Sequence, residues 1–160
     1  MIRTLTKDDA EAVLEIYAFG IKTRNATFET RVPTWKEWDA RHHAFCRFVF
    51  EDEDKIGGWA ALVPTSAREC YRGVAETSIY VAGHCLGRGI GSQLMELLIA
   101  DSEQRGIWTL TSSIFPENQA SIRLHYKFGF HEVGVRKKIA QLDGIWRDTL
   151  ILERRSKMVT

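Results

Sequence analysis

A carboxylate on an apolar strand, followed by a glycine-rich turn and an amphipathic helix, is the segment of this sequence best suited to chemistry. Glu76 opens the strand-like stretch 76–81, the turn follows at 86–91, and an apolar helical pattern begins at Ile90. A turn of this composition exposes backbone N–H groups at the positive end of a helix dipole, and such donors bind phosphate. The order predicts a phosphorylated ligand beside a group that Glu76 deprotonates.

The turn does not match the common nucleotide-binding motifs. It lacks the Gly-Lys-Ser/Thr of nucleoside triphosphate loops. Its glycines, Gly87, Gly89 and Gly91, come late in the chain rather than opening an alternating series of strands and helices, as in dinucleotide-binding folds. Taken alone, the turn fits equally well a tight strand-to-helix connection whose glycines provide positive φ. Other segments must decide between a structural turn and a binding site.

A second segment, from Glu117 to Phe130, resembles the Asn-x-x-Ala/Ser … aromatic-x-x-x-Gly-Phe helix of the GNAT superfamily of acyl-CoA-dependent N-acetyltransferases. Residues 86–91 resemble the Gln/Arg-x-x-Gly-x-Gly pyrophosphate loop of that superfamily. Further motifs look like the phosphinothricin acetyltransferase branch, which acetylates the α-amino group of phosphinothricin, methionine sulfoximine, methionine sulfone and related amino acids. These motifs are Tyr17-x-x-Gly-Ile21, Ala26-Thr-Phe-Glu-Thr30, Trp35-Lys-Glu-Trp38, Gly58-Trp59-Ala, Tyr71-Arg72 and Gly144-Ile-Trp-Arg-Asp148.

The resemblance implies acetyl-CoA as cosubstrate, with its pyrophosphate on the backbone N–H groups of 88–92 and its thioester beside the strand 76–81. Leu86 departs from the family pattern, which has Gln or Arg there, and we expect this departure to weaken cofactor binding. Arg88 adds a positive charge to the turn. The expected cofactor-binding residues are Tyr80, Val81, Gly87, Arg88, Gly89, Ile90, Gly91, Ser92, Asn118 and Ser121.

Glu76 and His125 are the candidate catalytic residues. A lone strand glutamate is usually exposed, but the apolar neighbours of Glu76 indicate a covered strand, where an unpaired acid is costly. In the resembled branch a glutamate at this place is the general base, which suits an α-amine whose pKa of about 7.7–8.0 keeps it mostly protonated near neutrality. His125 stands where many superfamily members have a tyrosine that protonates the departing thiolate. A catalytic and a packing role both stay open for His125.

By the same resemblance, four residues are expected to bind the acceptor: Phe28, Glu29, Arg72 and Trp146. Arg72 is the strongest candidate, because a bidentate guanidinium suits a carboxylate or the oxyanion of a sulfone or phosphinate. A surface arginine is the alternative interpretation. Phe28 and Glu29 are expected to wall the pocket, and Trp146 to lie at the pocket rim or against a neighbouring subunit. No metal ion is implied.

Composition favours a small-molecule substrate. The chain has 160 residues, 27% of them charged, and a net charge of +1, which is typical of one soluble domain, 1–160, and gives no sign of nucleic-acid or membrane partners. The N-terminus shows no signal peptide or membrane span. Cys46, Cys70 and Cys85 are unclustered, which favours free thiols in the cytoplasm. A homodimer is expected from the resemblance only.

Hydrophobic periodicity and the order of the elements predict an α/β fold around a mixed sheet. The resemblance implies a single-domain GNAT-like arrangement, with a mostly antiparallel central sheet flanked by helices. Capping boxes at Thr6 and Thr34 open two early helices. Two later helices are expected at 90–105 and 118–128. The expected strands are 2–5, 45–50, 55–63, 71–81, 109–114, 130–140 and 146–153.

Two rival functions remain at this level. Acetylation of a protein N-terminus or lysine requires an open acidic groove, and the only acidic run is 51–54. The second rival is a non-catalytic module that senses acyl-CoA. The presence of Glu76 and Arg72 argues against it, whereas the departure from the family pattern at Leu86 favours it slightly. Binding of acetyl-CoA without turnover on any amine would distinguish the sensing module from an enzyme.

Overall fold

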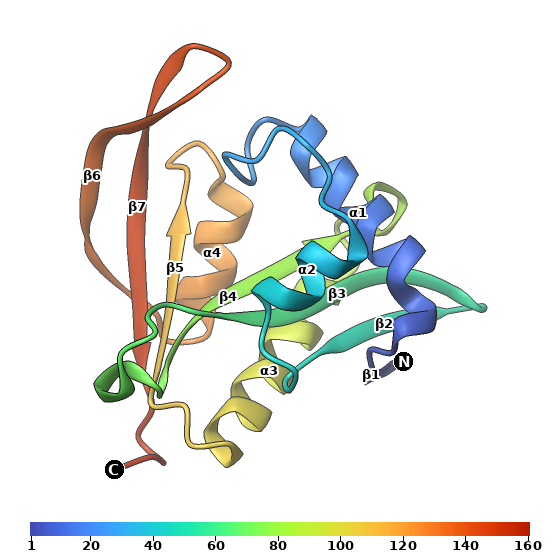
Figure 1. Cartoon of the computed structure of the whole chain (residues 1–160), viewed down its shortest axis with the longest axis horizontal. Helices are drawn as coiled ribbons and strands as arrows, with labels where there is room; N and C mark the ends of the chain where they lie inside the picture. The colour runs from blue at the N-terminus through green and yellow to red at the C-terminus, as the bar shows by residue number, and fades with distance from the viewer.

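The computed structural model describes all residues, 1–160, and contains one seven-stranded sheet in the order β1-β2-β3-β4-β5-β7-β6 (Figure 1). The strands are β1 (Ile2–Thr4), β2 (Phe48–Asp52), β3 (Lys55–Pro64), β4 (Val74–Val81), β5 (Thr109–Ile114), β6 (His131–Leu142) and β7 (Ile145–Arg155). The helices are α1 (Ala10–Lys22), α2 (Trp35–Arg41), α3 (Ile90–Gln104) and α4 (Gln119–Lys127). All neighbouring strands run antiparallel except β4 and β5, which are parallel. The predicted α/β fold with a mixed, mostly antiparallel sheet is confirmed.

Both predicted capping boxes lie at helix starts. The Thr34 hydroxyl accepts a hydrogen bond from the Glu37 N–H at 3.2 Å, at the beginning of α2. The Thr6 N–H donates to the Asp9 carboxylate at 2.8 Å, and a 3-10 turn at Lys7–Asp9 leads into α1. The first bond satisfies a backbone N–H of the first helical turn, and the second satisfies the N–H of the residue that precedes the turn.

The helices divide between the two faces of the sheet, as two neighbouring residues of β3 show. The ring of Trp59 packs against Tyr17 of α1 and Trp38 of α2. A Cβ at Gly58 would instead meet side chains of α3. Because successive strand residues point to opposite faces, α1 and α2 cover one face and α3 covers the other (Figure 1).

Strands β4 and β5 pair only over their first residues. The register joins Val74 to Thr109, Ala75 to Leu110 and Glu76 to Thr111, and it stops there. Beyond Glu76, β4 continues to pair with β3 and β5 with β7, so the two parallel strands separate (Figure 1). The edge of β4 that faces β5 has no partner strand over 77–81. Its backbone groups are therefore available to a ligand.

The start of β4 differs from the prediction in a way that matters for the site. The strand expected from Tyr71 begins at Val74, because Glu69–Tyr71 forms a 3-10 turn that Arg72 ends. The other predicted strands and helices are present, with ends shifted by up to three residues, as in β2, which begins at Phe48 rather than Phe45. Arg72 therefore lies on a loop before the strand.

Nearly all buried apolar side chains belong to one continuous cluster on the two faces of the sheet; Phe115 and Leu142 lie outside it. Cys46 and Cys85 are buried, Cys70 is exposed, and all three are free thiols. No helix of the structure is both long and apolar enough to span a membrane.

Gly20 of α1 provides a test of how tightly this helix packs on β4. A Cβ at Gly20 would lie 2.7 Å from the Tyr80 ring, although helix propensity favours alanine over glycine by about 1 kcal/mol. Because overpacking costs about 1–3 kcal/mol, we expect Gly20→Ala to unfold at a lower urea concentration than the wild type. Gly91→Ala on α3, where the nearest side-chain atom to an added Cβ lies at 3.4 Å, is the helical control and should unfold at the same or a higher urea concentration than the wild type. Equal midpoints for both variants would contradict the close contact of α1 with β4.

Candidate active site

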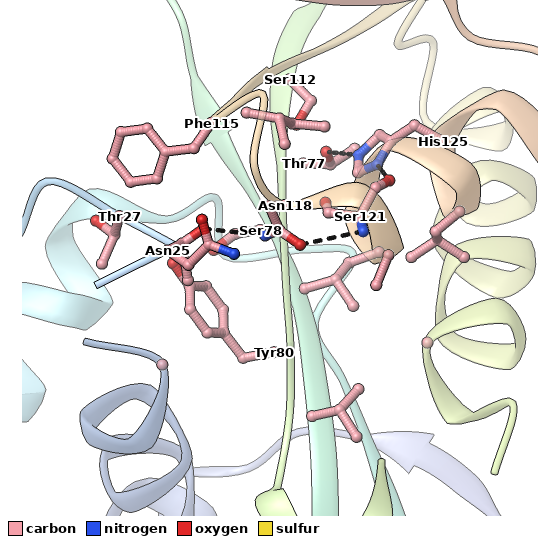
Figure 2. A pocket seen from close by; sticks show the side chains of 18 of the residues that line it. Asn25, Thr27, Thr77, Ser78, Tyr80, Ser112, Phe115, Asn118, Ser121 and His125 are labelled. Carbon is pink, nitrogen blue, oxygen red and sulfur yellow. Dashed lines mark hydrogen bonds between the residues drawn. The ribbon is translucent and has the colours of Figure 1, made fainter. Parts of the chain in front are cut away.

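A cavity of about 740 Å³ lies where β4 and β5 separate. Its walls come from β4 (76–81), the end of β5 and the residues after it (112–115), the loop that follows α1, the turn before α3, and α4. Figure 2 shows that side chains from these segments, far apart in the sequence, converge on one space. The cavity therefore has the position that the pattern of strand, turn and helix predicted.

Alternation along β4 divides the cavity into two sides. Glu76, Ser78 and Tyr80 share one face, as predicted, and the Tyr80 ring lies 4.9 Å from that of Tyr17 on α1. Thr77 points to the other face, toward α4. The carboxylate thus lies on the side of α1 and α2, and the glycine-rich turn on the side of α3 and α4.

Glu76 is a half-buried carboxylate on the cavity wall, and it forms no hydrogen bond or ion pair within the chain. Burial raises the pKa of its carboxyl group above the usual value, and the charges of Arg41 and Arg136 partly oppose this shift. A carboxylate with a raised pKa in a cavity is a candidate general base, because it binds a proton more readily than an exposed one.

His125 is buried, with 4% of its surface exposed, and both ring nitrogens have partners. Nδ1 lies 2.7 Å from the Ser121 carbonyl oxygen, which only accepts, so Nδ1 carries the hydrogen. Nε2 therefore accepts a hydrogen bond from the Thr77 hydroxyl at 3.1 Å (Figure 2). Burial lowers the pKa of His125, which favours the neutral ring. These contacts tie α4 to β4 at the edge of the cavity.

The glycine-rich turn has the conformation that the sequence predicted. Gly87 and Gly89 have φ of 77° and 76°, in the left-handed region that favours glycine. Gly89 is the N-cap of α3, so the first-turn N–H groups of Ile90, Gly91 and Ser92 have no acceptor within the helix. The residues of this segment that line the cavity are Leu86, Gly89, Gly91 and Ser92.

The cations beside this turn differ from those predicted. Arg88 forms an ion pair with Asp52 at 2.7 Å, and its side chain does not line the cavity. Two cations of α4, Arg123 and Lys127, do line it, and the Lys127 ammonium donates to the Ser92 hydroxyl at 3.2 Å. Neither was predicted. Their i, i+4 spacing, which puts both on one helix face, was the available signal.

Asn118 and Ser121 lie at the start of α4 on the cavity wall, as expected. The Asn118 side chain caps the helix by accepting from the Ser121 N–H at 3.3 Å. Its amide also donates to the Asn25 carbonyl at 3.1 Å, which joins the loop after α1 to α4 (Figure 2). Asn118 therefore holds together two segments that border the same cavity.

Two of the four predicted acceptor residues lie at the cavity. The rings of Phe28 and Phe115 meet edge to face with centroids 4.8 Å apart, and both residues line the wall. The Glu29 carboxylate pairs with Arg41 of α2 at 3.4 Å, and both of these side chains also line it. Arg41, which no motif indicated, thus brings a positive charge to the side that holds Glu76.

The structure does not bring Arg72 or Trp146 to the cavity. The Arg72 side chain is 63% exposed and stacks over the Trp108 ring at 5.2 Å, because it precedes β4 instead of belonging to it. Trp146 is 55% exposed on β7, in the hairpin that β7 forms with β6.

No group of three or more His, Cys, Asp or Glu side chains is arranged to hold a metal ion.

Comparisons with known proteins agree with this geometry. The model of the Acetyltransferase (GNAT) family matches residues 10–130. The phosphinothricin N-acetyltransferase of Alcaligenes faecalis is 33% identical, over 96% of this chain and 81% of its own. The L-methionine sulfoximine/L-methionine sulfone acetyltransferase of Pseudomonas aeruginosa is 28% identical, over 95% of this chain and 92% of its own.

A solved structure extends the comparison to the cosubstrate. It is a GNAT superfamily phosphinothricin acetyltransferase from Sinorhizobium meliloti in complex with acetyl-CoA, with a TM-score of 0.88 and 26% identity over 97% of this chain and 87% of that one. With a family match over most of its length, a cavity between separated strands and a glycine-rich turn at a helix N-terminus, the chain belongs to the GNAT acetyltransferase family and is an acetyl-CoA-dependent N-acetyltransferase.

Proposed function

We propose that the protein transfers the acetyl group of acetyl-CoA to the α-amino group of a small amino acid or analogue of the phosphinothricin, methionine sulfoximine or methionine sulfone type. The observation that carries this proposal is Glu76, an unpartnered carboxylate with a raised pKa on the wall of a cavity between two strands. The names of the relatives support the choice of acceptor.

Glu76 acts as the general base. It takes a proton from the ammonium group of the acceptor, directly or through one water, so that the neutral amine attacks the thioester carbonyl carbon. The C–N bond forms, the C–S bond breaks, and the second nitrogen proton leaves as the thiolate of CoA takes up a proton. Because both reactants are held in one cavity, proximity supplies much of the acceleration.

The unpaired edge of β4 receives the acetyl-CoA. Backbone N–H groups between Thr77 and Val81 lack a partner strand on the β5 side, so they are free to bind the pantetheine amides and the developing oxyanion. The pyrophosphate lies on the N–H groups of the turn at 88–92. Lys127 and Arg123 supply the positive charge beside the pyrophosphate. Arg88 does not, because its guanidinium pairs with Asp52.

His125 is a positioning residue in this proposal. Both of its nitrogens are occupied within the chain, so it would have to break one hydrogen bond before it could protonate a thiolate. The thiolate needs little help, since its conjugate acid has a pKa near 8.5 by analogy with cysteine.

The function is tested by following CoA release with a thiol reagent across a panel of amines. We expect saturable turnover with methionine sulfone, methionine sulfoximine and phosphinothricin, and none with polyamines or a histone-like peptide. Turnover only on the peptide or the polyamines would overturn the assignment of the acceptor. Binding of acetyl-CoA without turnover on any amine would favour the sensing module.

The role of Glu76 predicts both a rate and a pH profile. Glu76→Gln should lower kcat at least a hundredfold, the lower end for a general base, with the KM for acetyl-CoA unchanged. Burial raises the pKa of Glu76. As the pH is lowered, kcat of the wild type should therefore begin to fall at a pH above the pKa of an ordinary glutamate. Above the pKa of Glu76, the free energy of unfolding of Glu76→Gln should equal or exceed that of the wild type, because the variant lacks a carboxylate whose charged form burial disfavours. An unchanged kcat would overturn the role.

Lys127→Gln is the matched contrast to Glu76→Gln. Because Lys127 lies beside the turn and not on the side of Glu76, the variant should raise the KM for acetyl-CoA and leave kcat near the wild-type value. Steady-state kinetics with acetyl-CoA varied at saturating acceptor separates the two effects. If both variants changed only kcat, the division of the cavity into two sides would be wrong.

We further propose that the protein is a homodimer joined through the hairpin of β6 and β7. Strand β6 is an edge of the sheet and projects from the body of the molecule (Figure 1). Exposed apolar side chains gather on this hairpin: Val133, Val135, Ile139, Ile145 and Trp146. An exposed apolar edge strand favours pairing with another chain.

Light scattering after size exclusion tests the dimer. We expect the mass of two chains for the wild type and of one chain for Ile145→Glu. The control is Met158→Glu, which charges an exposed apolar side chain near the C-terminus, away from the hairpin, and should leave the dimer intact. A monomeric wild type would refute the homodimer.

A further inference from the structure

Strands β6 and β7 place a cation and a hydroxyl side by side. Arg136 of β6 lies directly opposite Thr149 of β7 in the antiparallel register. Residues that are directly opposite in such a pair point to the same face, with Cβ atoms about 4.5–5.5 Å apart. Neither residue belongs to the motifs discussed above, and they come from different strands, so only the register brings them together.

Thr149 lines the cavity and lacks a hydrogen-bond partner. The residue is 5% exposed, and its hydroxyl oxygen is buried with no donor or acceptor in reach. A buried hydroxyl without a partner costs free energy, and such groups are few in folded proteins. Rotation about the Cα–Cβ bond of Thr149 would turn this hydroxyl toward a ligand in the cavity, and a hydrogen bond formed there would remove the cost.

Arg136 is the second unpartnered group. It is exposed, and it forms no ion pair or hydrogen bond in the structure, whereas most other arginines of the chain do. The ladder of β6 and β7 loses its register just after Arg136 and regains it at Ala140. Lys138 within this bulge has a φ of 46°, and its N–H donates to Asp148 at 2.7 Å. Bulges next to sites redirect side chains.

Arg136 does not itself line the cavity, but the strand register places it beside Thr149, which does, and its charge partly opposes the rise in the pKa of Glu76. Two further arginines on this side have carboxylate partners: Arg41 pairs with Glu29, and Arg147 pairs with Glu117. Of these three arginines, Arg136 is thus the one that has no carboxylate of its own. A free guanidinium with a hydroxyl beside it suits a carboxylate, which accepts from both.

We propose that Arg136 and Thr149 bind the α-carboxylate of the acceptor amino acid while its amine lies at Glu76. The inference rests on the proposed function and names the groups that select an α-amino acid over a simple amine. The face of the sheet on which Thr149 lies indicates that its ligand is the acceptor and not the cofactor. Thr149 alternates with Ile151 and Glu153, and Glu153 pairs with Thr111, the partner of Glu76, so Thr149 lies on the Glu76 face.

The test uses two acceptors that differ only in the carboxylate: methionine sulfone and 3-(methylsulfonyl)propan-1-amine. Thr149→Val, an isosteric change, and Arg136→Gln should each raise the KM for methionine sulfone at least tenfold, as expected for a hydrogen bond to a charged group. Neither should change the KM for acetyl-CoA. Neither variant should raise the KM for 3-(methylsulfonyl)propan-1-amine. Where its turnover is undetectable, neither should raise its inhibition constant as a competitive inhibitor of methionine sulfone.

Matched variants separate binding from folding. Thr149→Ser keeps the hydroxyl and should restore most of the affinity for methionine sulfone. Lys137→Gln removes the adjacent cation, which pairs with Asp148, and should behave as the wild type. Thr149→Val should melt at or above the wild-type temperature, because it removes a buried hydroxyl without a partner.

The outcomes distinguish this inference from the proposed function. A wild type that turns over methionine sulfone while both variants keep its KM would overturn the inference alone. An equal rise in the KM for both acceptors would also overturn it, because the two residues would then not bind the carboxylate, the group in which the acceptors differ. A wild type without turnover on any α-amino acid would overturn the proposed function and this inference with it.

Discussion

The separation of two parallel strands is the constraint on which the rest of the structure depends. β4 and β5 share three paired residues and then separate, while each stays paired with its other neighbour. The separation leaves backbone groups of β4 over 77–81 without a partner strand, along the wall of the cavity. An extended ligand with amide groups would pair with these backbone groups, which is why we propose that acetyl-CoA binds along this edge.

The two faces of the sheet give the two reactants separate surroundings. On the side of α3 and α4, helix N-terminal N–H groups and the cations Arg123 and Lys127 border the cavity, and these are the groups that we propose bind the pyrophosphate. On the side of α1 and α2, aromatic rings and the Glu76 carboxylate surround a smaller space. The hydrogen bond between Thr77 and His125 fixes α4 at the boundary between them. In the proposed mechanism, acetyl transfer takes place where the two sides meet, along the free edge of β4.

The features that agree with the sequence predictions are those whose physical cause is local. Positive φ at Gly87 and Gly89, the cap of Thr34 and the alternation of Glu76 with Tyr80 each depend on a few neighbouring residues, and each is present as predicted. The same reasoning failed for side chains whose direction depends on a distant partner. Arg88 turns to Asp52, 36 positions away in the chain, because an unpaired carboxylate lies there. Arg72 leaves the site because a 3-10 turn delays the start of β4.

The sequence by itself determined the family, the elements and the place of Glu76, the proposed general base, on its strand, because capping, glycine conformation and periodicity act over one or two turns. Only the tertiary structure decided which cations face the ligand and which polar groups lack a partner. Lys127 reaches Ser92 across two helices, and Arg136 meets Thr149 through a strand register broken by a bulge. Such pairings follow from how whole elements pack, since the free energy that sets a register is spread over many contacts rather than carried by the residues that it brings together.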